Sequence, residues 1–236
     1  MQAGKKCNSQ FKQKALEKAT GDWILQLDAD EVVTPELAEE IRKIIKMTPN
    51  QLKRRKINEA NKRKLFRKHQ EVIEKRDGKI GKETDEIVGF FVARKNFFLR
   101  RPLIHAGVYP DGVIRLVRKG KARFPGKSVH EQIILEGEVA WLSNDLEHHD
   151  TPTLSRYFTR MNRYTDLHAE DLKERKAPQD IFYFAYYCFL VPIGVFLSLY
   201  IRHKGFLDGV KGFMWSLFSS WHYPVAYFKY WTRIKK

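Results

Sequence analysis

The chain has 236 residues, of which 44 are Lys or Arg and 28 are Asp or Glu, so its formal net charge is +16. This length suits one large domain or a domain with an appendage, and it can bury a core without disulfides. The hydrophobic share of 43% excludes a wholly disordered chain. The two cysteines, Cys7 and Cys188, lie far apart, which argues against a zinc ribbon or a disulfide scaffold and fits a reducing compartment.

The first part of the chain predicts a helix, a strand and a second helix in close succession. Residues 11–19 favour a short helix, and the apolar run 23–27 favours a buried strand. The acidic cluster 28–31 follows at the carboxyl end of that strand. Thr34 and Pro35 then indicate the start of a helix, with Thr34 as the N-cap and Pro35 in the first turn.

A strongly basic segment follows, and it predicts a helical insertion at about residues 42–82. Between residues 42 and 76 the chain has 14 Lys or Arg and only 3 Asp or Glu, which is a local net charge of +11. One interpretation is a solvated helical hairpin. The other is a surface that binds polyanions, either anionic lipid headgroups or nucleic acid.

The middle of the chain predicts more strands, and the part after residue 150 predicts helices. Strand-like runs occur at residues 87–93, 97–99 and 112–117, and residues 129–135 and 138–142 are expected to pair as a hairpin. Apolar residues from Leu154 to Leu172, including Tyr164, recur at helical spacing and predict an amphipathic helix that ends before Pro178. The expected fold class is α/β over residues 1–150, followed by an α-helical region over residues 151–236.

The segment Ile181–Ile201 has 21 residues without a charge, which is close to the roughly 20 residues that cross a bilayer as a helix. Pro192 and Gly194 permit a kink or a re-entrant hairpin. The C-terminal stretch is rich in aromatic and basic residues, which favour the membrane–water interface. The alternative is a buried helix pair of a soluble protein. The residues that we expect to contact a membrane are Phe182, Tyr186, Phe189, Trp215 and Trp221.

Asp28 and Asp30 are the residues most suited to chemistry. They leave the end of an expected strand two positions apart, so both carboxylates can face one hard cation. Mg²⁺ or Mn²⁺ held there neutralises the charge on a departing diphosphate. An Asp-x-Asp pair alone is weak evidence, because it occurs by chance in many proteins.

The sequence around this pair is more specific, because Phe11–Thr34 resembles a segment of the family 2 glycosyltransferases, which have the GT-A fold. Gly89–Asn96, Tyr109–Arg118, Lys127–Gln132 and Thr151–Thr165 follow in the order seen in the bacterial branch related to lipopolysaccharide-core sugar transferases. The resemblance implies a partial, Rossmann-like GT-A sheet and an inverting transfer from a nucleotide sugar with a divalent metal. It also implies a lipid-linked or glycan acceptor at the cytoplasmic face of the bacterial inner membrane. The chain would be peripheral there or have one inserted segment.

On the matching positions, the resemblance makes Asp28 and Asp30 the metal-binding pair, with Asp30 as the more direct ligand. Asp28 would also contact the donor. Arg115 and Arg118 would grip the diphosphate of the donor, because guanidinium groups bind phosphate oxygens in pairs. For Arg118, a surface position without a ligand is the alternative.

Glu131 is the candidate general base that takes the proton of the acceptor hydroxyl. Its alternative is a structural carboxylate paired with one of the two arginines. His130 would orient Glu131 or contact the acceptor, and a structural histidine is as plausible. His148 and His149 are candidates for a metal or phosphate contact, against the simpler interpretation of loop histidines.

One departure from the family pattern affects the expected activity. The strand–helix units that hold the nucleotide in this family lie upstream of the segment that begins at Phe11, and only ten residues precede Phe11 here. We therefore expect a truncated chain with weak or absent transfer by itself. The competing hypothesis is a non-catalytic membrane-binding remnant of the family. Nucleic acid is not expected as a partner, because no nucleic-acid-binding signature accompanies the charge.

Overall fold

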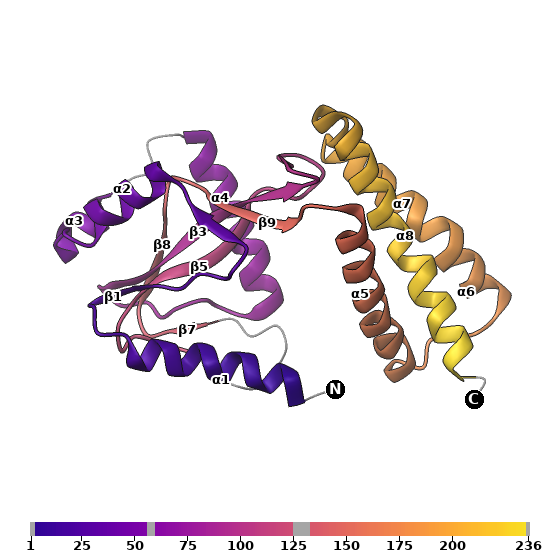
Figure 1. Ribbon diagram of the computed structural model, residues 1–236, viewed down its shortest axis with the longest axis horizontal. Helices are drawn as coiled ribbons and strands as arrows, with labels where there is room; N and C mark the ends of the chain where they lie inside the picture. The colour runs from indigo at the N-terminus through magenta and orange to yellow at the C-terminus, as the bar shows by residue number, and fades with distance from the viewer. Residues whose placement is uncertain (1–2, 56–59, 125–132, 235–236) are drawn as a thin grey trace. The chain divides into compact units, whose positions relative to one another are not determined.

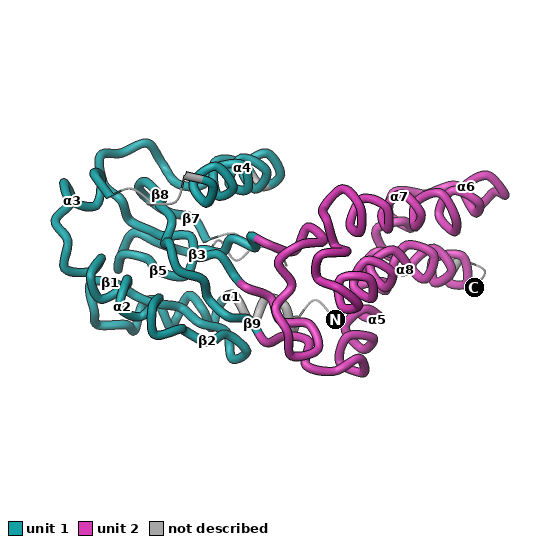
Figure 2. The backbone as a smooth tube through the Cα atoms, turned by 90° about the horizontal axis from the view of Figure 1, so that it is seen from above, with its two compact units in different colours: residues 1–94, 110–148 teal, residues 95–109, 149–236 magenta. Residues whose placement is uncertain are grey.

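The structure is a computed structural model that describes residues 3–55, 60–124 and 133–234. It divides the chain into two compact units (Figure 2). The first unit comprises residues 1–94 and 110–148, and the second comprises residues 95–109 and 149–236. The predicted α/β class with a helical C-terminal region is confirmed, and the mixed sheet is consistent with a partial GT-A fold.

The main sheet has seven strands in the order β1-β5-β3-β9-β2, with β4 and β8 also paired to β3 (Figure 1). β8 is parallel to β3, and the other pairs whose register is known are antiparallel. Two further strands, β6 and β7, pair with each other. The strands are β1 (Trp23–Leu25), β2 (Glu31–Val33), β3 (Ile87–Phe98), β4 (Arg101–Pro102), β5 (Asp111–Arg118), β6 (Ala122–Arg123), β7 (Ile134–Leu135), β8 (Glu138–Trp141) and β9 (Leu146–Thr151).

Helices of the first unit pack on both faces of this sheet. They are α1 (Ala3–Lys18), α2 (Pro35–Ile44), α3 (Pro49–Arg54) and α4 (Ala60–Asp77). The predicted cap is confirmed, because the Thr34 hydroxyl accepts the backbone N–H of Leu37 at 3.2 Å. Leu37 and its neighbours on α2 and α3 pack against Phe90, on one face of β3.

The basic segment is partly a structural element of the sheet. Phe66 of α4 is buried and stacks on Trp141 with 4.3 Å between ring centroids. Trp141 in turn stacks on Phe91, the neighbour of Phe90 on β3, at 4.6 Å. Successive strand residues point to opposite faces, so α4 covers the face opposite to α2. The basic segment is therefore not a fully solvated helical hairpin, because one side of α4 packs on the sheet.

Two strand predictions are wrong in detail. The sequence suggested a break at residues 94–96, but β3 runs on through Phe98, because Arg94 lies opposite Asp111 in the ladder and pairs with it. The expected hairpin around residues 136 and 137 does not form either, since β7 pairs with β6 and β8 with β3. A Cβ at Gly137 would lie 2.6 Å from Val88, so the glycine allows this close approach to β3.

The second unit is built of helices. They are α5 (Leu154–Glu174), α6 (Ile181–Ala185), η1 (Tyr186–Leu190), α7 (Val191–Leu197), η2 (Ser198–Arg202), η3 (Gly205–Asp208) and α8 (Gly209–Ile234). The segments α6 to η2 form one helical stretch in which η1 and η2 are π-helical, and π-turns are a common way to accommodate a proline such as Pro192. Tyr164 was expected on the buried stripe of α5, but it is 48% exposed.

Aromatic clusters hold this unit together. Tyr157 of α5 packs with Phe98 and Trp215, and Tyr227 of α8 packs with Leu172 and Tyr187. Asp208 anchors η3 by accepting the backbone N–H groups of residues 104 and 105, at 3.1 and 2.8 Å. Among the described residues, one helical stretch, Ile181–Arg202, is long and apolar enough to cross a membrane, with a mean hydropathy of 1.9.

Candidate metal and donor site

The acidic cluster after β1 is folded into a tight turn. The backbone N–H of Gln26 donates to the carbonyl of Arg115 at 2.9 Å, which keeps the chain against β5 up to the turn. The backbone N–H of Asp28 then donates to Glu31 Oε2 at 3.0 Å, and that of Glu31 donates to the carbonyl of Asp28 at 3.1 Å. The turn therefore fixes where the carboxylates of residues 28–31 are presented.

A buried arginine lies at the centre of this cluster. The Arg115 guanidinium places Nη2 at 2.5 Å from Asp28 Oδ2 and at 2.6 Å from Glu31 Oε1. Arg115 is 7% exposed and Glu31 is 8% exposed. The register of β3 and β5 shifts so that Phe90 faces residue 116 and Phe91 faces residue 114, which leaves Arg115 at a bulge. Bulges of this kind re-aim a side chain, here toward the two carboxylates.

Lys12 of α1 completes the set of cations around Asp28. Its Nζ lies 2.8 Å from Asp28 Oδ1, so each oxygen of that carboxylate has a cationic partner. Burial by itself would raise the pKa of Asp28, but the hydrogen bond from Lys12 and the charge of Arg115 outweigh it, and the pKa is lowered. Asp28 is therefore an ionised and firmly held carboxylate.

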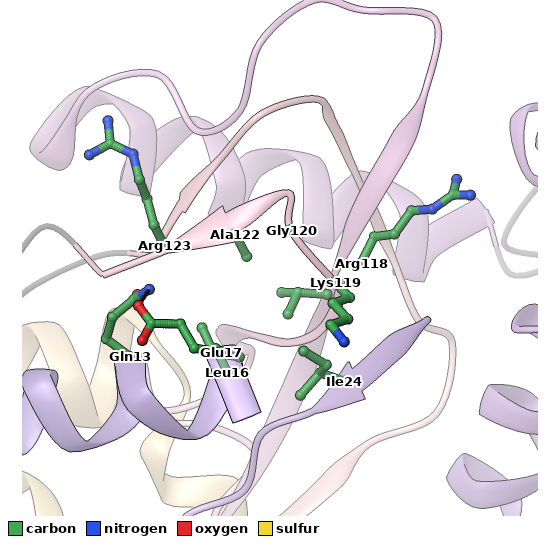
Figure 3. A pocket seen from close by; sticks show the side chains of 10 residues that line it. Gln13, Leu16, Glu17, Ile24, Arg118, Lys119, Gly120, Ala122 and Arg123 are labelled. Carbon is green, nitrogen blue, oxygen red and sulfur yellow. Dashed lines mark hydrogen bonds between the residues drawn. The ribbon is translucent and has the colours of Figure 1, made fainter. Parts of the chain in front are cut away.

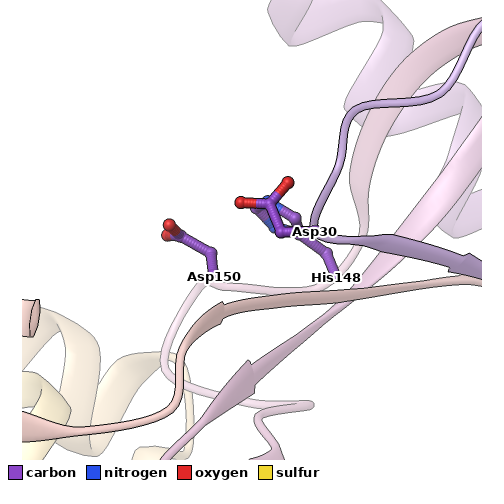
Figure 4. Close-up of side chains that lie close together, drawn as sticks. All are labelled: Asp30, His148 and Asp150. Atoms are coloured by element: carbon purple, nitrogen blue, oxygen red, sulfur yellow. The ribbon is translucent and has the colours of Figure 1, made fainter.

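Asp30 faces a different partner. β2 and β9 pair so that Glu31 lies opposite His148, and His148 Nε2 is 3.6 Å from Asp30 Oδ1 (Figure 4). Burial lowers the pKa of His148, and the charge of the nearby Arg94 lowers it further. The neighbouring carboxylates raise this pKa, but the lowering effects are larger. The imidazole is thus neutral near pH 7 and retains a nitrogen lone pair for a ligand.

Figure 4 also draws Asp150, which comes two positions after His148 on the same strand. Residues two apart on a strand share a face, so Asp150 and His148 point to the same side of β9. Asp150 belongs to the second unit, where it is ion-paired with Arg160. Within the first unit, Asp30 and His148 are the pair that a cation can approach.

Arg94 links the site to a further carboxylate. Its Nη2 lies 2.6 Å from Asp111 Oδ2, and its Nη1 lies 3.6 Å from Glu31 Oε1. Sequence reasoning assigned no role to Lys12, Glu31, Arg94 or Asp111. Glu31 is adjacent to the predicted pair, and Lys12, Arg94 and Asp111 all stand in blocks that resemble the family, so each had a signal.

Arg118 does not join Arg115 at the carboxylates. It forms an ion pair with Glu86 and lines a pocket of about 370 Å³ between α1, β1 and the β5–β6 turn (Figure 3). Lys119, Arg123 and Glu17 line the same pocket together with Leu16 and Ile24, so its wall has charges of both signs beside apolar surface. A diphosphate contact by Arg118 stays a prediction. Arg115, the other predicted donor contact, is engaged by two carboxylates.

The remaining predicted residues fall elsewhere. Glu131 and His130 lie outside the described residues, so their roles as base and orienting group stay predictions. His149 stacks on Phe97 in the second unit, at 4.2 Å between ring centroids. Four of the five expected membrane residues are exposed, and Trp215 is the exception: it packs into the interior of the second unit, beside Phe98 and Tyr157.

The donor set fits a divalent cation. Asp30 offers carboxylate oxygens, which are the ligands that Mg²⁺ and Mn²⁺ prefer, and its side chain is 31% exposed and so can be reached from solvent. His148 adds a neutral imidazole beside it. Asp28 already has two cationic partners, Lys12 and Arg115, and its role as a metal ligand stays a prediction.

Comparisons with known proteins find two matches to glycosyltransferases. Residues 12–107, which include Asp28, Asp30 and Glu31, match the model of the family described as "Glycosyl transferase family 2". The chain is also similar to the lipopolysaccharide core biosynthesis glycosyltransferase LpsC of Rhizobium meliloti (strain 1021), with 34% identity over 139 residues. That match covers 56% of this chain and 48% of LpsC, so the chain spans about half the length of this relative. Over residues 12–107 the chain is thus similar to glycosyl transferase family 2.

Proposed function

We propose that this chain transfers a sugar from a nucleotide-sugar donor to a lipid-linked or glycan acceptor of the cell envelope. The observation that carries the proposal is the placement of Asp30 beside His148 in the turn between β1 and β2, next to an Asp28 that Lys12 and Arg115 hold in place. The family match and the similarity to a lipopolysaccharide core glycosyltransferase support the reaction class and the kind of acceptor.

Asp30 and His148 would hold a divalent cation, Mg²⁺ or Mn²⁺. When bound, such a cation neutralises the charge that develops on the departing diphosphate. Arg115 acts as a positioning residue, because it fixes the carboxylates of Asp28 and Glu31 from a buried site. Arg118 lines the pocket beside α1 and is the candidate for a contact with the phosphates of the donor.

The transfer itself needs a base on the acceptor side. The acceptor hydroxyl oxygen bonds to the anomeric carbon of the sugar while the bond from that carbon to the diphosphate oxygen breaks, so the configuration inverts. The hydroxyl proton goes to a carboxylate, for which Glu131 is our candidate, and the nucleoside diphosphate leaves with the electrons of the broken bond. His130 would orient that carboxylate.

The direct test is sugar transfer from labelled UDP-, GDP- and ADP-sugars to envelope glycolipids in the presence of Mn²⁺ or Mg²⁺. Transfer by this chain alone is expected to be slow, but it should depend on the metal, use one donor class and fall at least about 100-fold in Asp30→Ala. Asp85→Ala is the matched control, because Asp85 is fully exposed and pairs with Lys53 only at the surface; it should stay within about twofold.

Two results would contradict the proposal. Equal transfer by wild type and Asp30→Ala would remove Asp30 from the site. Membrane binding without transfer from any donor would instead favour the alternative, a non-catalytic membrane-binding member of the family.

A further inference from the structure

The helical stretch α6 to η2 has an apolar face that none of the described helices and strands of the second unit covers. Phe182 is 81% exposed, and further apolar side chains are exposed one turn apart along the helix. The exposed set on this face is Phe182, Tyr186, Phe189, Leu190, Ile193, Leu197 and Ile201. Their spacing of three or four residues places them on one stripe of the helix.

The opposite face of the same stretch packs on α8. Phe184 meets Phe228 with 6.0 Å between ring centroids, Tyr187 stacks on Tyr227 at 4.9 Å, and Phe196 meets Phe213 at 5.7 Å. As the residue number increases along α6 to η2, the number of the partner residue on α8 decreases, so the two helices are antiparallel. α8 accompanies the stretch over its whole length.

α5 also packs along the length of α8. Tyr157 packs with Trp215, His168 Nδ1 lies 3.1 Å from His222 Nε2, and Asp166 pairs with Lys229 at 3.0 Å. Figure 1 shows these three helices side by side. α5 is highly charged, with eight ionisable acids and bases among its 21 residues: Arg156, Arg160, Arg163, Asp166, Glu170, Asp171, Lys173 and Glu174. One side of the helical layer is therefore apolar and the other is charged.

This arrangement decides between two ways of meeting a bilayer. A helix of 22 residues is about 33 Å long, which is enough to cross the hydrocarbon core. If the stretch crossed, α8 and α5 would accompany it to the same depth and carry the charges of α5 into the hydrocarbon. If it lay flat, only its exposed stripe would enter the lipid and α5 would stay in water.

Cations flank the apolar stripe at both ends. Arg175 and Lys176 precede it, with the exposed Asp180 between them and the stripe as the N-cap of α6. Arg202 and Lys204 follow it, and all four cationic side chains are exposed. No acid interrupts the sequence from Ile181 to Lys204. Basic groups at the ends of an immersed helix complement the anionic headgroups of a bilayer surface.

We propose that the stretch α6 to η2 lies in the plane of an anionic bilayer surface, with its exposed stripe immersed and its flanking cations at the headgroups, and that it does not cross. The inference is independent of the donor and of sugar transfer. It goes beyond the apolar length of the segment, because it rests on which helices accompany that segment.

Binding of the full chain to vesicles tests the surface. Phosphatidylcholine vesicles with phosphatidylglycerol should bind at least tenfold more tightly than phosphatidylcholine alone, and the double variant Phe189→Glu/Ile193→Glu should lose at least tenfold. Tyr164→Glu, on an exposed position of α5, is the control and should stay within twofold. Replacing Arg202 and Lys204 by Gln should weaken binding to the anionic vesicles about fivefold for each cation. Unchanged binding by the double variant would overturn the proposal.

The depth of the helix tests its orientation. Single spin labels at positions 182, 186, 189, 193, 197 and 201, in a Cys7→Ser/Cys188→Ala background, should all report one shallow depth of about 5–10 Å below the headgroups. A profile deepest near position 193 and shallow at both ends would show that the helix crosses, and would overturn the proposal. So would a stable dimer without lipid that Phe189→Glu dissociates, together with no vesicle binding, because the stripe would then be a contact between two copies.

Discussion

The two units of the chain place charge and apolar surface in opposite ways. In the first unit Arg115 and Glu31 are buried among the strands, whereas the large apolar residues of the sheet, such as Phe90 and Phe91, fill the core. In the second unit the charges of α5 face outward and apolar residues such as Phe182 are exposed. Buried ion pairs hold groups in fixed positions, whereas an exposed apolar stripe is typical of a surface that binds a membrane or another protein. Charge thus organises the candidate site of the first unit, whereas the second unit exposes the apolar stripe for which we propose a membrane contact.

Removing the buried arginine should have the largest effect on stability. Arg115→Met leaves the carboxylates of Asp28 and Glu31 without their central cation, which we expect to cost about 3–5 kcal/mol in the free energy of opening of β1 and β5. Hydrogen exchange of the amides in these two strands measures this free energy of opening separately from that of the second unit.

The matched substitution in the other unit is Phe189→Ser, which removes an exposed apolar side chain. It should change the free energy of opening of α8, measured by hydrogen exchange, by less than about 0.5 kcal/mol. If the arginine variant were as stable as wild type, Arg115 would not be a positioning residue. If Phe189→Ser were strongly destabilising, the stripe would be part of the core.

A second effect, of about 3 kcal/mol, is expected for Phe66→Ala on α4. The substitution leaves a cavity beside Trp141, whose ring is sandwiched between Phe66 and Phe91. Hydrogen exchange of β3 and β8 reports the loss. Val72→Ala, on an exposed position of the same helix, is the control and should have little effect. Equal effects would mean that the basic segment is not packed on the sheet.

The smallest effect concerns pH and the contact between α5 and α8. Burial, and the neighbouring His168 and Lys229, lower the pKa of His222 from 6.5 to about 4, so the ring is neutral in the fold. Below pH 6.5 the unfolded chain takes up a proton that the folded chain does not. The stability of the second unit should therefore fall between pH 6.5 and 4, by about 2 kcal/mol after allowance for partial exposure, and this group adds no further loss below pH 4.

Thermal unfolding followed by near-ultraviolet circular dichroism at pH 7, 5.5 and 4.5 measures this dependence. His222→Gln should flatten it, whereas His149→Gln, which removes a histidine outside this contact, should not. Identical pH profiles for wild type and His222→Gln would refute the assignment.

What the sequence predicted well was local. The Thr34 cap depends on residues three positions apart, and the charge-free run from Ile181 depends on composition alone. The position of Asp28 and Asp30 after a strand also follows from neighbours in the chain, since β1 ends three residues before Asp28 and five before Asp30.

What the sequence could not predict depends on strand pairing and helix docking. Lys12 reaches Asp28 from a helix, and Arg115 reaches Glu31 from a strand 84 positions later. His148 comes to Asp30 only because β9 pairs with β2 in one register. The same reason explains why β8 lies beside β3 and forms no hairpin, since tertiary pairing overrode the local turn signal.

The most direct test of the central claim is the binding of Mn²⁺ to the full chain, followed by electron paramagnetic resonance of the free ion. We predict one site, weakened at least tenfold by Asp30→Asn and by His148→Gln and unchanged within twofold by Asp85→Asn. Mn²⁺ binding with equal affinity in wild type and Asp30→Asn would contradict the assignment of this site.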